Sequence, residues 1–415
     1  MNPSSLRVDG ARLWQSLMDL ARIGATPKGG VCRLALTDLD RQGRDLVAGW
    51  LREAGASIEV DGAGNIFATR RGRKDGAPVV LTGSHVDTQP SGGKFDGNYG
   101  VLAGLEMLRT LNDAHVATDK PVGVAIWTNE EGTRFIPTMG GSGAFAQVFT
   151  LDYLLAQRDS DGISFGEALD RIGYAGTTPV GGRALDAYFE AHIEQGPILE
   201  RESKVIGVVT GALGQRWYDC VWTGQDAHAG PTPMEARHDA LRGAARLIEA
   251  VNALALRHAP EGRATVGFVQ VRPNSRNVIP GRVTMSVDMR HPDDEALSRM
   301  DRELRDAAAD VARGLRLECE IEQVVEFAAS HFDRRCVESV ATAAQKLGYS
   351  TRRIVSGAAH DAVYLSRVTP TSMIFVPCKD GISHNETEDA DPKHLEAGAN
   401  VLLHAVLERA GAAAS

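Results

Sequence analysis

Val79-Val80-Leu81-Thr82 and Val122-Gly123-Val124-Ala125-Ile126-Trp127 are short apolar runs bounded by glycine and proline, with helical periodicity between them around residues 101–111. Apolar runs without alternation are typical of strands buried on both faces, so this stretch predicts a strand, helix, strand unit of a parallel sheet. Ligands of such sheets bind beyond the carboxyl ends of the strands. Because His85 and Asn129-Glu130-Glu131 directly follow the two runs, their positions favour chemistry.

Further elements are expected on both sides of this unit. Helical periodicity predicts surface helices over residues 13–21 and 40–54, the second after Thr37 and Asp38 as cap residues. A C-terminal helix over about residues 392–407 should pack back on the sheet. The core of this part is therefore expected to be an α/β fold with a mixed, mostly parallel sheet flanked by helices.

The pattern changes at about Gln215. Strands are expected over residues 217–222, 265–271, 283–288 and 315–321, and helices over 234–256 and 293–312. This β-α-β-β-α-β order can close a four-stranded, ferredoxin-like α+β sheet with two helices on one face. We therefore predict a catalytic domain formed by residues 1–213 with 329–415, and an inserted domain formed by residues 214–328.

Composition excludes several classes of partner. The 415 residues are 43% hydrophobic and 24% charged, which is ordinary for a globular protein long enough for two domains. A net charge of −9 gives no electrostatic case for nucleic acid or an anionic membrane, so a small-molecule partner is expected. The absence of a membrane-length apolar run and of a signal-peptide pattern in residues 1–30 predicts a cytoplasmic protein. Five scattered cysteines without C-x-x-C indicate neither disulfides nor a thiolate zinc site.

Imidazoles and carboxylates recur at separated points, each beside an apolar run or a glycine turn. They are His85 with Asp87, Asp96, Glu130 with Glu131, His192, and His384. Ligands held on strand ends would have this distribution. The sequence therefore predicts a two-metal hydrolase site.

His85 and Asp87 form an H-x-D pair in which the carboxylate can orient the imidazole or brace the site. Asp96 lies in Gly92-Gly93-Lys94-Phe95-Asp96-Gly97, whose glycines suit a turn that presents one carboxylate, and such a carboxylate can bridge two cations. The alternatives are a buried histidine bonded to its neighbour and an Asp-Gly turn without a ligand. A phosphate loop is disfavoured because Phe, not Ser or Thr, follows Lys94.

Glu130 and Glu131 are adjacent, so on extended backbone their side chains point in different directions. One can bind a metal while the other acts as a general base, whose pKa must lie near the working pH. A solvated acidic turn is the alternative, but it is not expected directly after an apolar strand. His192 and His384 supply the remaining imidazoles, and the other nine of the 12 histidines are assigned no metal role.

Taken together, these motifs resemble the hydantoinase/carbamoylase family of metal-dependent amidases, and the resemblance covers nearly the whole chain. This family includes N-carbamoyl-L-amino acid hydrolases, allantoate amidohydrolases and bacterial β-ureidopropionases, and is related to di-zinc aminoacylases and carboxypeptidases. Beyond the ligand motifs, the resemblance is carried by residues 140–145, 192–197, 214–217, 227–230, 273–280 and 288–292.

The resemblance implies two divalent ions, one held by His85, Asp96 and His192 and the other by Asp96, Glu131 and His384. Asp96 would bridge them, and Glu130 would deprotonate a metal-bridging water and pass the proton to the departing nitrogen. A histidine at 192, where the wider peptidase clan usually has a carboxylate, points to the carbamoylase branch. Zinc is expected first, with manganese, cobalt or nickel as alternatives, because imidazole and carboxylate ligands accept all four.

Substrate contacts are implied in the same way. The resemblance places Gln195, Gln215, Asn277, Arg290 and the Gly357-Ala358 turn around the substrate, and His228 would stabilise the oxyanion. Arg290 offers a planar fork that pairs with a carboxylate, although an exposed arginine in a salt bridge is the alternative. The inserted domain would serve as the lid and dimerisation domain of a homodimer, in which His228 acts in its own or the neighbouring subunit's site.

We therefore expect a hydrolase of carbon–nitrogen bonds other than peptide bonds, in linear amides or amidines: an N-carbamoyl-L-amino acid hydrolase yielding amino acid, CO2 and ammonia. Allantoate amidohydrolase and β-ureidopropionase stay open, because Gln195, Asn277 and Arg290 would grip the carboxylate of each substrate. Aminoacylase or dipeptidase activity is a further alternative, and a non-enzymatic binding protein would require loss of the base or of ligands. A serine hydrolase is disfavoured, since Gly162-Ile163-Ser164-Phe165-Gly166 follows a polar segment rather than an apolar strand.

Overall fold

The computed structural model describes residues 5–413, which divide into two units. One unit contains the chain up to Thr210 together with the chain from His331, and the other is Gly211–Ser330. The first unit is thus assembled from both flanks of the second. The roles of these units as catalytic and lid domains stay predictions.

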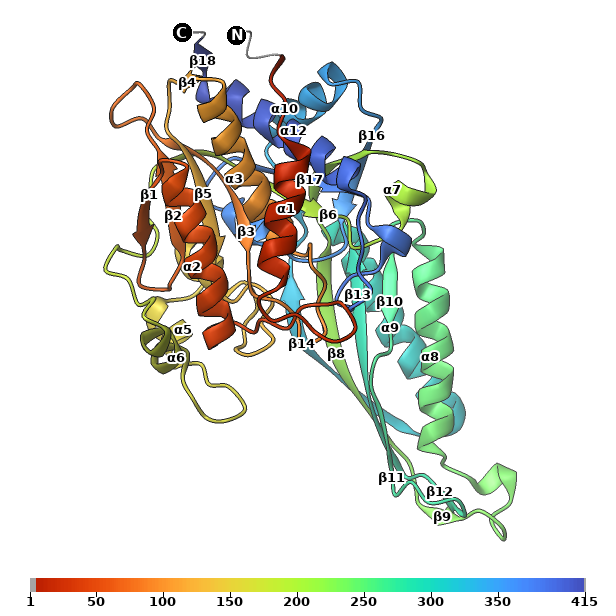
Figure 1. Ribbon diagram of the computed structural model, residues 1–415. Coiled ribbons are helices and arrows are strands. Elements are labelled where there is room, and N and C mark those ends of the chain that lie inside the picture. The colour runs from red at the N-terminus through yellow and green to blue at the C-terminus, as the bar shows by residue number, and fades with distance from the viewer. Residues whose placement is uncertain (1–4, 414–415) are drawn as a thin grey trace. The chain divides into compact units, whose positions relative to one another are not determined.

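A mixed nine-stranded sheet forms the centre of the first unit (Figure 1). Its strands, in order of neighbours, are β1 (Ser57–Val60), β2 (Ile66–Arg70), β5 (Val122–Trp127), β3 (Val79–His85), β6 (Leu185–Ile193), β17 (Thr371–Val376), β7 (Ile206–Ala212) and β15 (Ser330–His331), with β16 (Thr351–Ser356) paired to β7. The four central strands β5, β3, β6 and β17 are parallel, whereas β2 and β7 join them antiparallel. The predicted α/β fold is confirmed.

The strand, helix, strand unit predicted from the apolar runs is present. β3 and β5 pair in parallel with His85 opposite Trp127, and α3 (Asn98–Asp113) lies between them in the chain. Every residue of both strands is buried, which is why neither run alternates. On the other side of β3, the ladder to β6 reaches Thr82 opposite Phe189. His85 and His192, each three residues further on, therefore end neighbouring strands.

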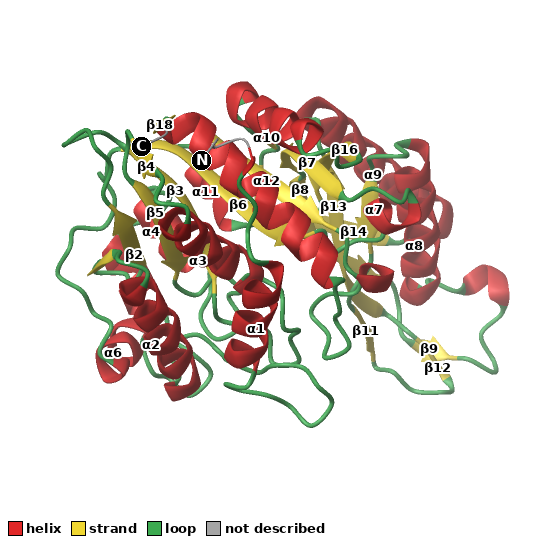
Figure 2. Cartoon of the chain, turned by 45° about the horizontal axis from the view of Figure 1, so that its top comes forward, coloured by secondary structure: helices red, strands yellow, loops and turns green. Residues whose placement is uncertain are grey.

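Two groups of helices contact the sheet. In the first, α3 and α12 (Pro392–Ala410) lie over the central strands, as Figure 2 shows, and α1 (Gly10–Ala21) and α10 (Arg334–Lys346) pack against this pair. In the second, α4 (Gly140–Phe145) and α11 (Asp361–Leu365) contact each other and the central strands. The predicted helix after Thr37 is α2 (Asp38–Glu53), and the Thr37 hydroxyl accepts from the Asp40 N–H at 3.3 Å.

The G-x-S-x-G sequence begins a helix. Ser164 Oγ accepts from the Glu167 N–H at 3.1 Å, and the Glu167 carboxylate accepts from the Ser164 N–H at 2.7 Å, which together form a capping box. Ser164 is therefore a helix cap rather than a nucleophile. The other short elements of this unit are β4 (Ala117–Thr118), α5 (Leu151–Ala156), α6 (Phe165–Ile172), α7 (Ile198–Arg201), η3 (Lys379–Gly381) and β18 (Ala412–Ala413).

The second unit is an antiparallel sheet with two helices. Its elements are β8 (Gly214–Thr223), β9 (Ala227–His228), η2 (Met234–Ala236), α8 (Ala240–Arg257), β10 (Arg263–Thr265), β11 (Val269–Arg272), β12 (Val278–Ile279), β13 (Arg282–His291), α9 (Asp294–Leu315) and β14 (Glu318–Phe327). The sheet order is β10, β13, β8, β14, and β11 also pairs with β13. Tyr218, Cys220 and Trp222 alternate into a core shared with α8 and α9.

Three predicted elements of this unit were misplaced. The helix expected from residue 234 begins at Ala240, because the Asp239 carboxylate accepts from the Leu241 and Arg242 N–H groups and so caps it there. The strand expected over 265–271 is broken into β10 and β11, which lie in line along β13. The strand expected over 315–321 is β14, which begins at Glu318 after α9 ends. The small β9/β12 ribbon was not predicted.

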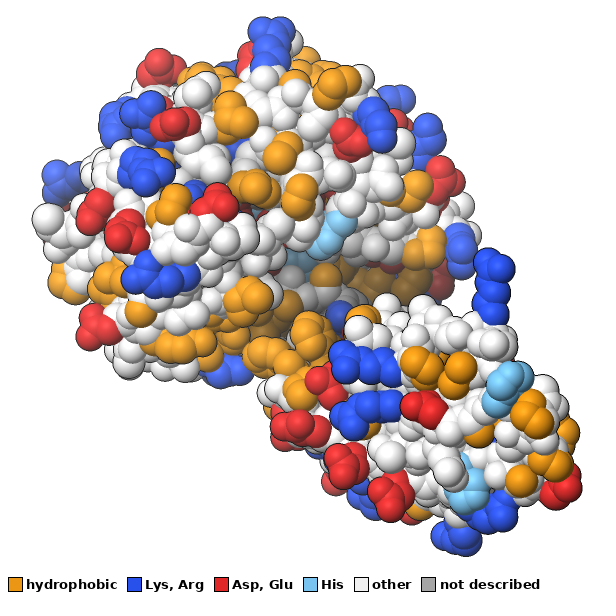
Figure 3. Space-filling view, turned by 90° about the horizontal axis from the view of Figure 1, so that it is seen from below, with side chains coloured by type: hydrophobic (Ala, Val, Ile, Leu, Met, Phe, Trp, Pro, Cys, Tyr) orange, Lys and Arg blue, Asp and Glu red, His pale blue; other side chains and the backbone are white. Residues whose placement is uncertain are grey.

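The surface carries both signs of charge. Acidic and basic side chains are interspersed over the face of the molecule shown in Figure 3. Within residues 5–413, none of the helices has the length and apolar composition of a membrane span.

Candidate metal centre

Two triplets of metal-ligand side chains in the first unit share Asp96. One consists of His85, Asp96 and His192, and the other of Asp96, Glu131 and His384. Within each triplet the ligand atoms lie within 4.8 Å of one another. The five predicted metal ligands, which span residues 85 to 384, are therefore brought together. The parallel strands are the reason, because β3, β6 and β17 end at the same edge of the sheet.

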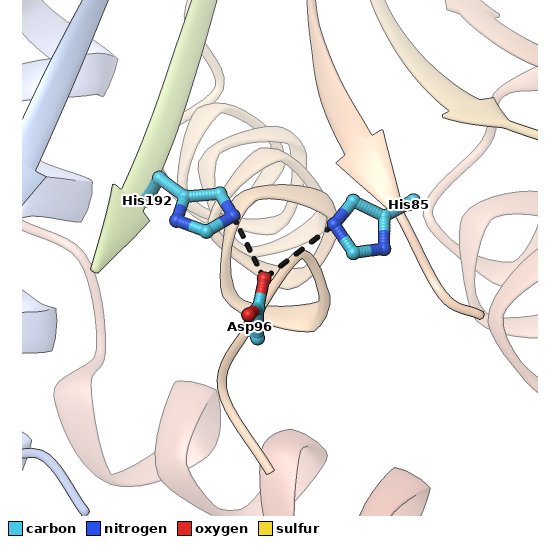
Figure 4. A group of neighbouring side chains, drawn as sticks. All are labelled: His85, Asp96 and His192. Carbon is cyan, nitrogen blue, oxygen red and sulfur yellow. Dashed lines mark ion pairs between the residues drawn. The ribbon is translucent and has the colours of Figure 1, made fainter. Parts of the chain in front are cut away.

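In the first triplet, both imidazoles point at one carboxylate oxygen (Figure 4). Asp96 Oδ1 lies 3.2 Å from His192 Nε2 and 3.6 Å from His85 Nε2. Ligands that bind zinc at about 2.0 to 2.1 Å in a tetrahedron are separated by about 3.3 Å, so these separations suit a common ion. His85 and His192 are 1% exposed and Asp96 is 4% exposed, so this triplet is closed to bulk water.

The tautomers of the two buried histidines suit metal binding. His85 Nδ1 lies 2.9 Å from the Asp87 carbonyl oxygen, and His192 Nδ1 lies 2.9 Å from the Ile193 carbonyl oxygen. Each Nδ1 therefore donates to a carbonyl oxygen, and each Nε2 is the ring nitrogen that faces Asp96. The carboxylate of Asp87 has a different role, because it accepts from the Glu130 and Glu131 N–H groups at 3.3 Å each. Asp87 thus braces both halves of the site.

Gly97 shows why one position of the glycine-rich turn must be glycine. It has φ +65°, and a Cβ added there would lie 2.3 Å from the His85 ring. Any larger residue would displace the imidazole. The residue after Asp96 must therefore be glycine for His85 to reach its ligand position.

The second triplet uses the other oxygen of Asp96. His384 Nε2 lies 3.4 Å from Asp96 Oδ2 and 3.4 Å from Glu131 Oε2. Gln89 Nε2 donates to the same Glu131 oxygen at 2.6 Å. Each oxygen of Asp96 therefore faces a different triplet, which is the arrangement of a bridging carboxylate. The side chain of His384 is 51% exposed, so this half is more open than the first.

Glu130 and Glu131 point to different histidines. Glu130 Oε2 lies 3.4 Å from His85 Nε2, whereas Glu131 lies beside His384. Burial, and then the negative charges of Asp361, Glu131 and Asp96, raise the pKa of Glu130 well above its ordinary value despite the opposing effect of His85. Burial and Asp96 raise the pKa of Glu131 to about 7. Burial would also raise the pKa of Asp96, but its contacts with the three histidines outweigh burial and hold that pKa well below the usual range.

Strained backbone marks the edge of the site. Asn129, Gln195 and His384 have φ values of 56°, 58° and 53°, which lie in the left-handed region that few non-glycine residues adopt. Gln195 Nε2 donates to Asp96 Oδ2 at 2.8 Å, and its Oε1 is buried without a hydrogen-bond partner among the described residues. This unpaired acceptor is available to an N–H group of a ligand.

The Gly357-Ala358 turn lies in the same unit and reaches the metal ligands through a residue that the sequence reasoning missed. His360 Nε2 lies 3.0 Å from Ser356 Oγ, and the Ala358 N–H donates to that oxygen at 3.1 Å. The His360 ring lies 4.5 Å from the His192 ring, centroid to centroid. Burial and the neighbouring His192 lower the pKa of His360, which keeps it neutral. A Cβ added at Gly357 would meet no atom within 4 Å, so the turn borders open space.

The other predicted substrate contacts fall on the second unit, in two pairs. Gln215 on β8 is directly opposite Arg290 on β13. Arg290 Nη2 pairs with Asp288 Oδ2 at 2.8 Å, so the salt bridge considered from sequence is present. His228 on β9 is opposite Val278, and the Ala229 N–H donates to the Asn277 carbonyl at 2.8 Å, which puts His228 beside Asn277 on the ribbon.

These two pairs lie at opposite ends of the second unit's sheet. β13 runs from Arg282, opposite Thr223, to Arg290, opposite Gln215. At about 3.3 Å per residue, this distance is about 26 Å. The β9/β12 ribbon is attached at the Arg282 end of the sheet, where the Gly224 N–H donates to the Gly281 carbonyl. Figure 1 and Figure 2 both show the ribbon extending beyond this end of the sheet. One small molecule cannot span both pairs within a single unit.

Known proteins match this chain over nearly its whole length. The model of peptidase family M20/M25/M40 matches residues 81–408. An N-carbamoyl-L-amino-acid amidohydrolase from Rhizobium meliloti is 50% identical over 404 residues, which is 97% of each chain. An allantoate amidohydrolase from Bacillus subtilis is 34% identical and covers 92% of this chain and 93% of its own.

Solved structures agree. An amidase of the hydantoinase/carbamoylase family from Burkholderia multivorans is 62% identical, superposes with a TM-score of 0.96, and covers 98% of this chain and 99% of its own. The resemblance inferred from the motifs is confirmed. The chain belongs to the metal-dependent peptidase family M20/M25/M40 and, within it, to the hydantoinase/carbamoylase amidases.

Proposed function

We propose that this protein hydrolyses the carbamoyl C–N bond of N-carbamoyl-L-amino acids, releasing the amino acid, CO2 and ammonia. The observation that carries the proposal is the pair of ligand triplets that share Asp96, with Glu130 beside them. The relative from Rhizobium meliloti supports this substrate class. The allantoate amidohydrolase from Bacillus subtilis supports allantoate as the second candidate, and N-carbamoyl-β-alanine is the third.

Two divalent cations are proposed, zinc first, held by the two triplets with Asp96 between them. The donor set supports this, because neutral imidazole nitrogens and carboxylate oxygens are ligands of zinc, manganese, cobalt and nickel. Bound cations would polarise the carbamoyl carbonyl and lower the pKa of water for attack. The hydrogen bonds of His85 and His192 to backbone carbonyls fix the orientation of both rings and so support this role.

Glu130 is the proposed general base. Glu130 is 7% exposed, and its carboxylate lies beside His85 of the first triplet, where it can take a proton from the attacking water. Its raised pKa makes it a stronger base than an exposed glutamate, and the protonated form can then donate to the departing nitrogen. The Glu130 N–H is tied to Asp87, which keeps this residue in place during both transfers.

The substrate's carboxylate and ureido group would be held by amides and one guanidinium. Arg290, with its partner Gln215, offers a charged fork for the carboxylate, and Asp288 holds that fork in one orientation. Gln195 Oε1 would accept from a ureido N–H. The roles of Gly357 and Ala358 are proposed from the open space beside the turn.

The geometry of the second unit supports the proposal of a homodimer with shared sites. His228 with Asn277, and Arg290 with Gln215, lie too far apart to meet one substrate from the same unit. If both pairs contact the substrate, one pair must come from a second copy of the chain. We therefore propose that the second unit mediates dimerisation as well as substrate binding. A cytoplasmic location is proposed on composition alone.

The test is ammonia release by metal-reconstituted protein against N-carbamoyl-L-amino acids, allantoate and N-carbamoyl-β-alanine, with N-acetyl-amino acids and dipeptides as controls. We expect the highest kcat/KM for an N-carbamoyl-L-amino acid. A higher value for allantoate would select the second candidate. Turnover of N-acetyl compounds alone would contradict the proposal.

A further inference from the structure

Glu388 is a buried carboxylate beside the bridging ligand, and the mechanism described above does not use it. It is 4% exposed. Its Oε1 accepts from the Phe95 N–H at 2.9 Å and from the Asp96 N–H at 3.1 Å, and its Oε2 accepts from the Ser383 hydroxyl at 3.0 Å. One side chain thus binds the backbone of the Asp96 turn and the residue next to His384.

The glycine-rich turn is shaped to admit this side chain. A Cβ added at Gly93 would lie 2.1 Å from both Cδ and Oε1 of Glu388. The glycine at 93 therefore leaves the space that the carboxylate occupies. The sequence reasoning assigned the glycines of this motif to a tight turn only, whereas one of them makes room for a residue almost 300 positions later.

Ser383 extends the connection to the ligand oxygen. Its hydroxyl lies 2.8 Å from Asp96 Oδ2 and 3.0 Å from Glu388 Oε2, so two carboxylates share one proton donor. The Glu388 N–H donates to the Asn385 carbonyl at 3.0 Å, which closes a short turn after His384. Glu388 therefore forms hydrogen bonds with the backbone of Asp96 and with the segment that carries His384.

A carboxylate is an unfavourable choice for a purely structural role here. Glu388 is buried and shares the Ser383 hydroxyl with the carboxylate of Asp96, so a charge at this position is costly unless a positive charge lies nearby. A neutral amide could accept the two backbone N–H groups at a lower electrostatic cost. The carboxylate becomes favourable when cations occupy the triplets, because their positive charge offsets both Asp96 and Glu388.

We propose that Glu388 is a positioning residue that holds Asp96 and the His384 segment in the arrangement required for two cations. This inference rests on the proposed two-metal function. Loss of Glu388 weakens the binding of both ions, because Asp96 belongs to both triplets. Substitutions of residues that orient metal ligands typically lower metal affinity about 10- to 100-fold.

The test compares Glu388→Ala with Glu386→Gln, whose carboxylate lies in the same segment but pairs with exposed Lys28 at 3.6 Å. Zn2+ affinity is measured by chelator competition, and Tm is measured with and without Zn2+. For Glu388→Ala we expect about 10- to 100-fold weaker Zn2+ binding. Without metal, the Tm of the variant should fall because the Phe95 and Asp96 N–H groups lose their acceptor. With Zn2+ the Tm should fall further, because the gain in Tm on metal binding shrinks as well. Glu386→Gln should match the wild type in each measurement.

Unchanged Zn2+ affinity in Glu388→Ala would overturn the inference, as would equal losses of Tm with and without metal. If Glu388→Ala does not fold, Glu388→Gln decides, because it keeps one acceptor oxygen but removes the charge. Weaker Zn2+ binding than in Glu386→Gln supports the role, and equal binding rejects it. Failure of the wild type to bind Zn2+ would instead reject the proposed function.

Discussion

The two units present their candidate functional residues in opposite ways. In the first unit, His85, Asp96 and His192 are buried, and neighbouring groups fix their orientation. In the second unit, His228 and Asn277 are exposed on a two-stranded ribbon. The difference teaches that contacts within the first unit hold the candidate metal ligands in one arrangement. The candidate substrate contacts His228 and Asn277 instead lie on the surface of the second unit.

The largest effect is expected at the base. Glu130→Gln should lower kcat by about 10^2- to 10^4-fold, because an amide cannot take the proton. Metal content should be unchanged, since Glu130 is not in either triplet. Steady-state kinetics with elemental analysis test this. Near-normal kcat in the fully metal-loaded variant would show that Glu130 is not the general base.

His228→Ala should come next, with about 10^2- to 10^3-fold loss of kcat if this exposed histidine stabilises the oxyanion. Mixing this variant with Glu130→Gln tests the shared site, because a mixed dimer regains one complete site. If His228 acts in the neighbouring subunit's site, activity should recover to about a quarter of the wild-type value after subunit exchange.

The matched control mixes Arg290→Lys with Glu130→Gln, which reports on the opposite end of the β8/β13 sheet. Only one of the two mixtures should recover activity. Recovery in neither mixture, together with a monomer in sedimentation, would contradict the dimer proposal.

Arg290→Lys should lower kcat/KM by about 10- to 100-fold, because a lysine cannot form a bidentate pair with a carboxylate. Metal content should again be unchanged. The Asp288→Asn variant serves as a control, since it loosens the orientation of Arg290 and should have a smaller effect. Normal kinetics of Arg290→Lys would rule out a carboxylate clamp on the second unit.

The smallest effect concerns the open half of the metal centre. Contact with Asp96 raises the pKa of His384 to about 9, so in the metal-free protein this imidazole is protonated at neutral pH. A cation must displace that proton, and affinity for the second ion should therefore rise with pH until about 9. Zn2+ titrations between pH 6.5 and 8.5 test this, with His384→Ala as control. A flat profile would show that binding of the ion does not displace a proton from His384.

Local sequence predicted the centre of the first unit well and the second unit less well. The β3 and β5 runs, the Thr37 cap and the ligand motifs all depend on periodicity or on neighbouring residues. The helix expected from Met234 begins six residues later, because the Asp239 cap outweighed the apolar periodicity before it. His360 was missed because its importance comes from contact with His192, which no local pattern reveals.

The sequence by itself determined which side chains form the candidate metal centre, since strand ends, glycine turns and paired carboxylates are local features. Only the tertiary structure decided which oxygen of Asp96 faces which histidine, and that Glu388 holds the Asp96 turn. It also decided that Gln215 lies beside Arg290 and away from His228. The physical reason is that strand order and register bring together residues far apart in the chain, and that choice is made by packing of the whole sheet.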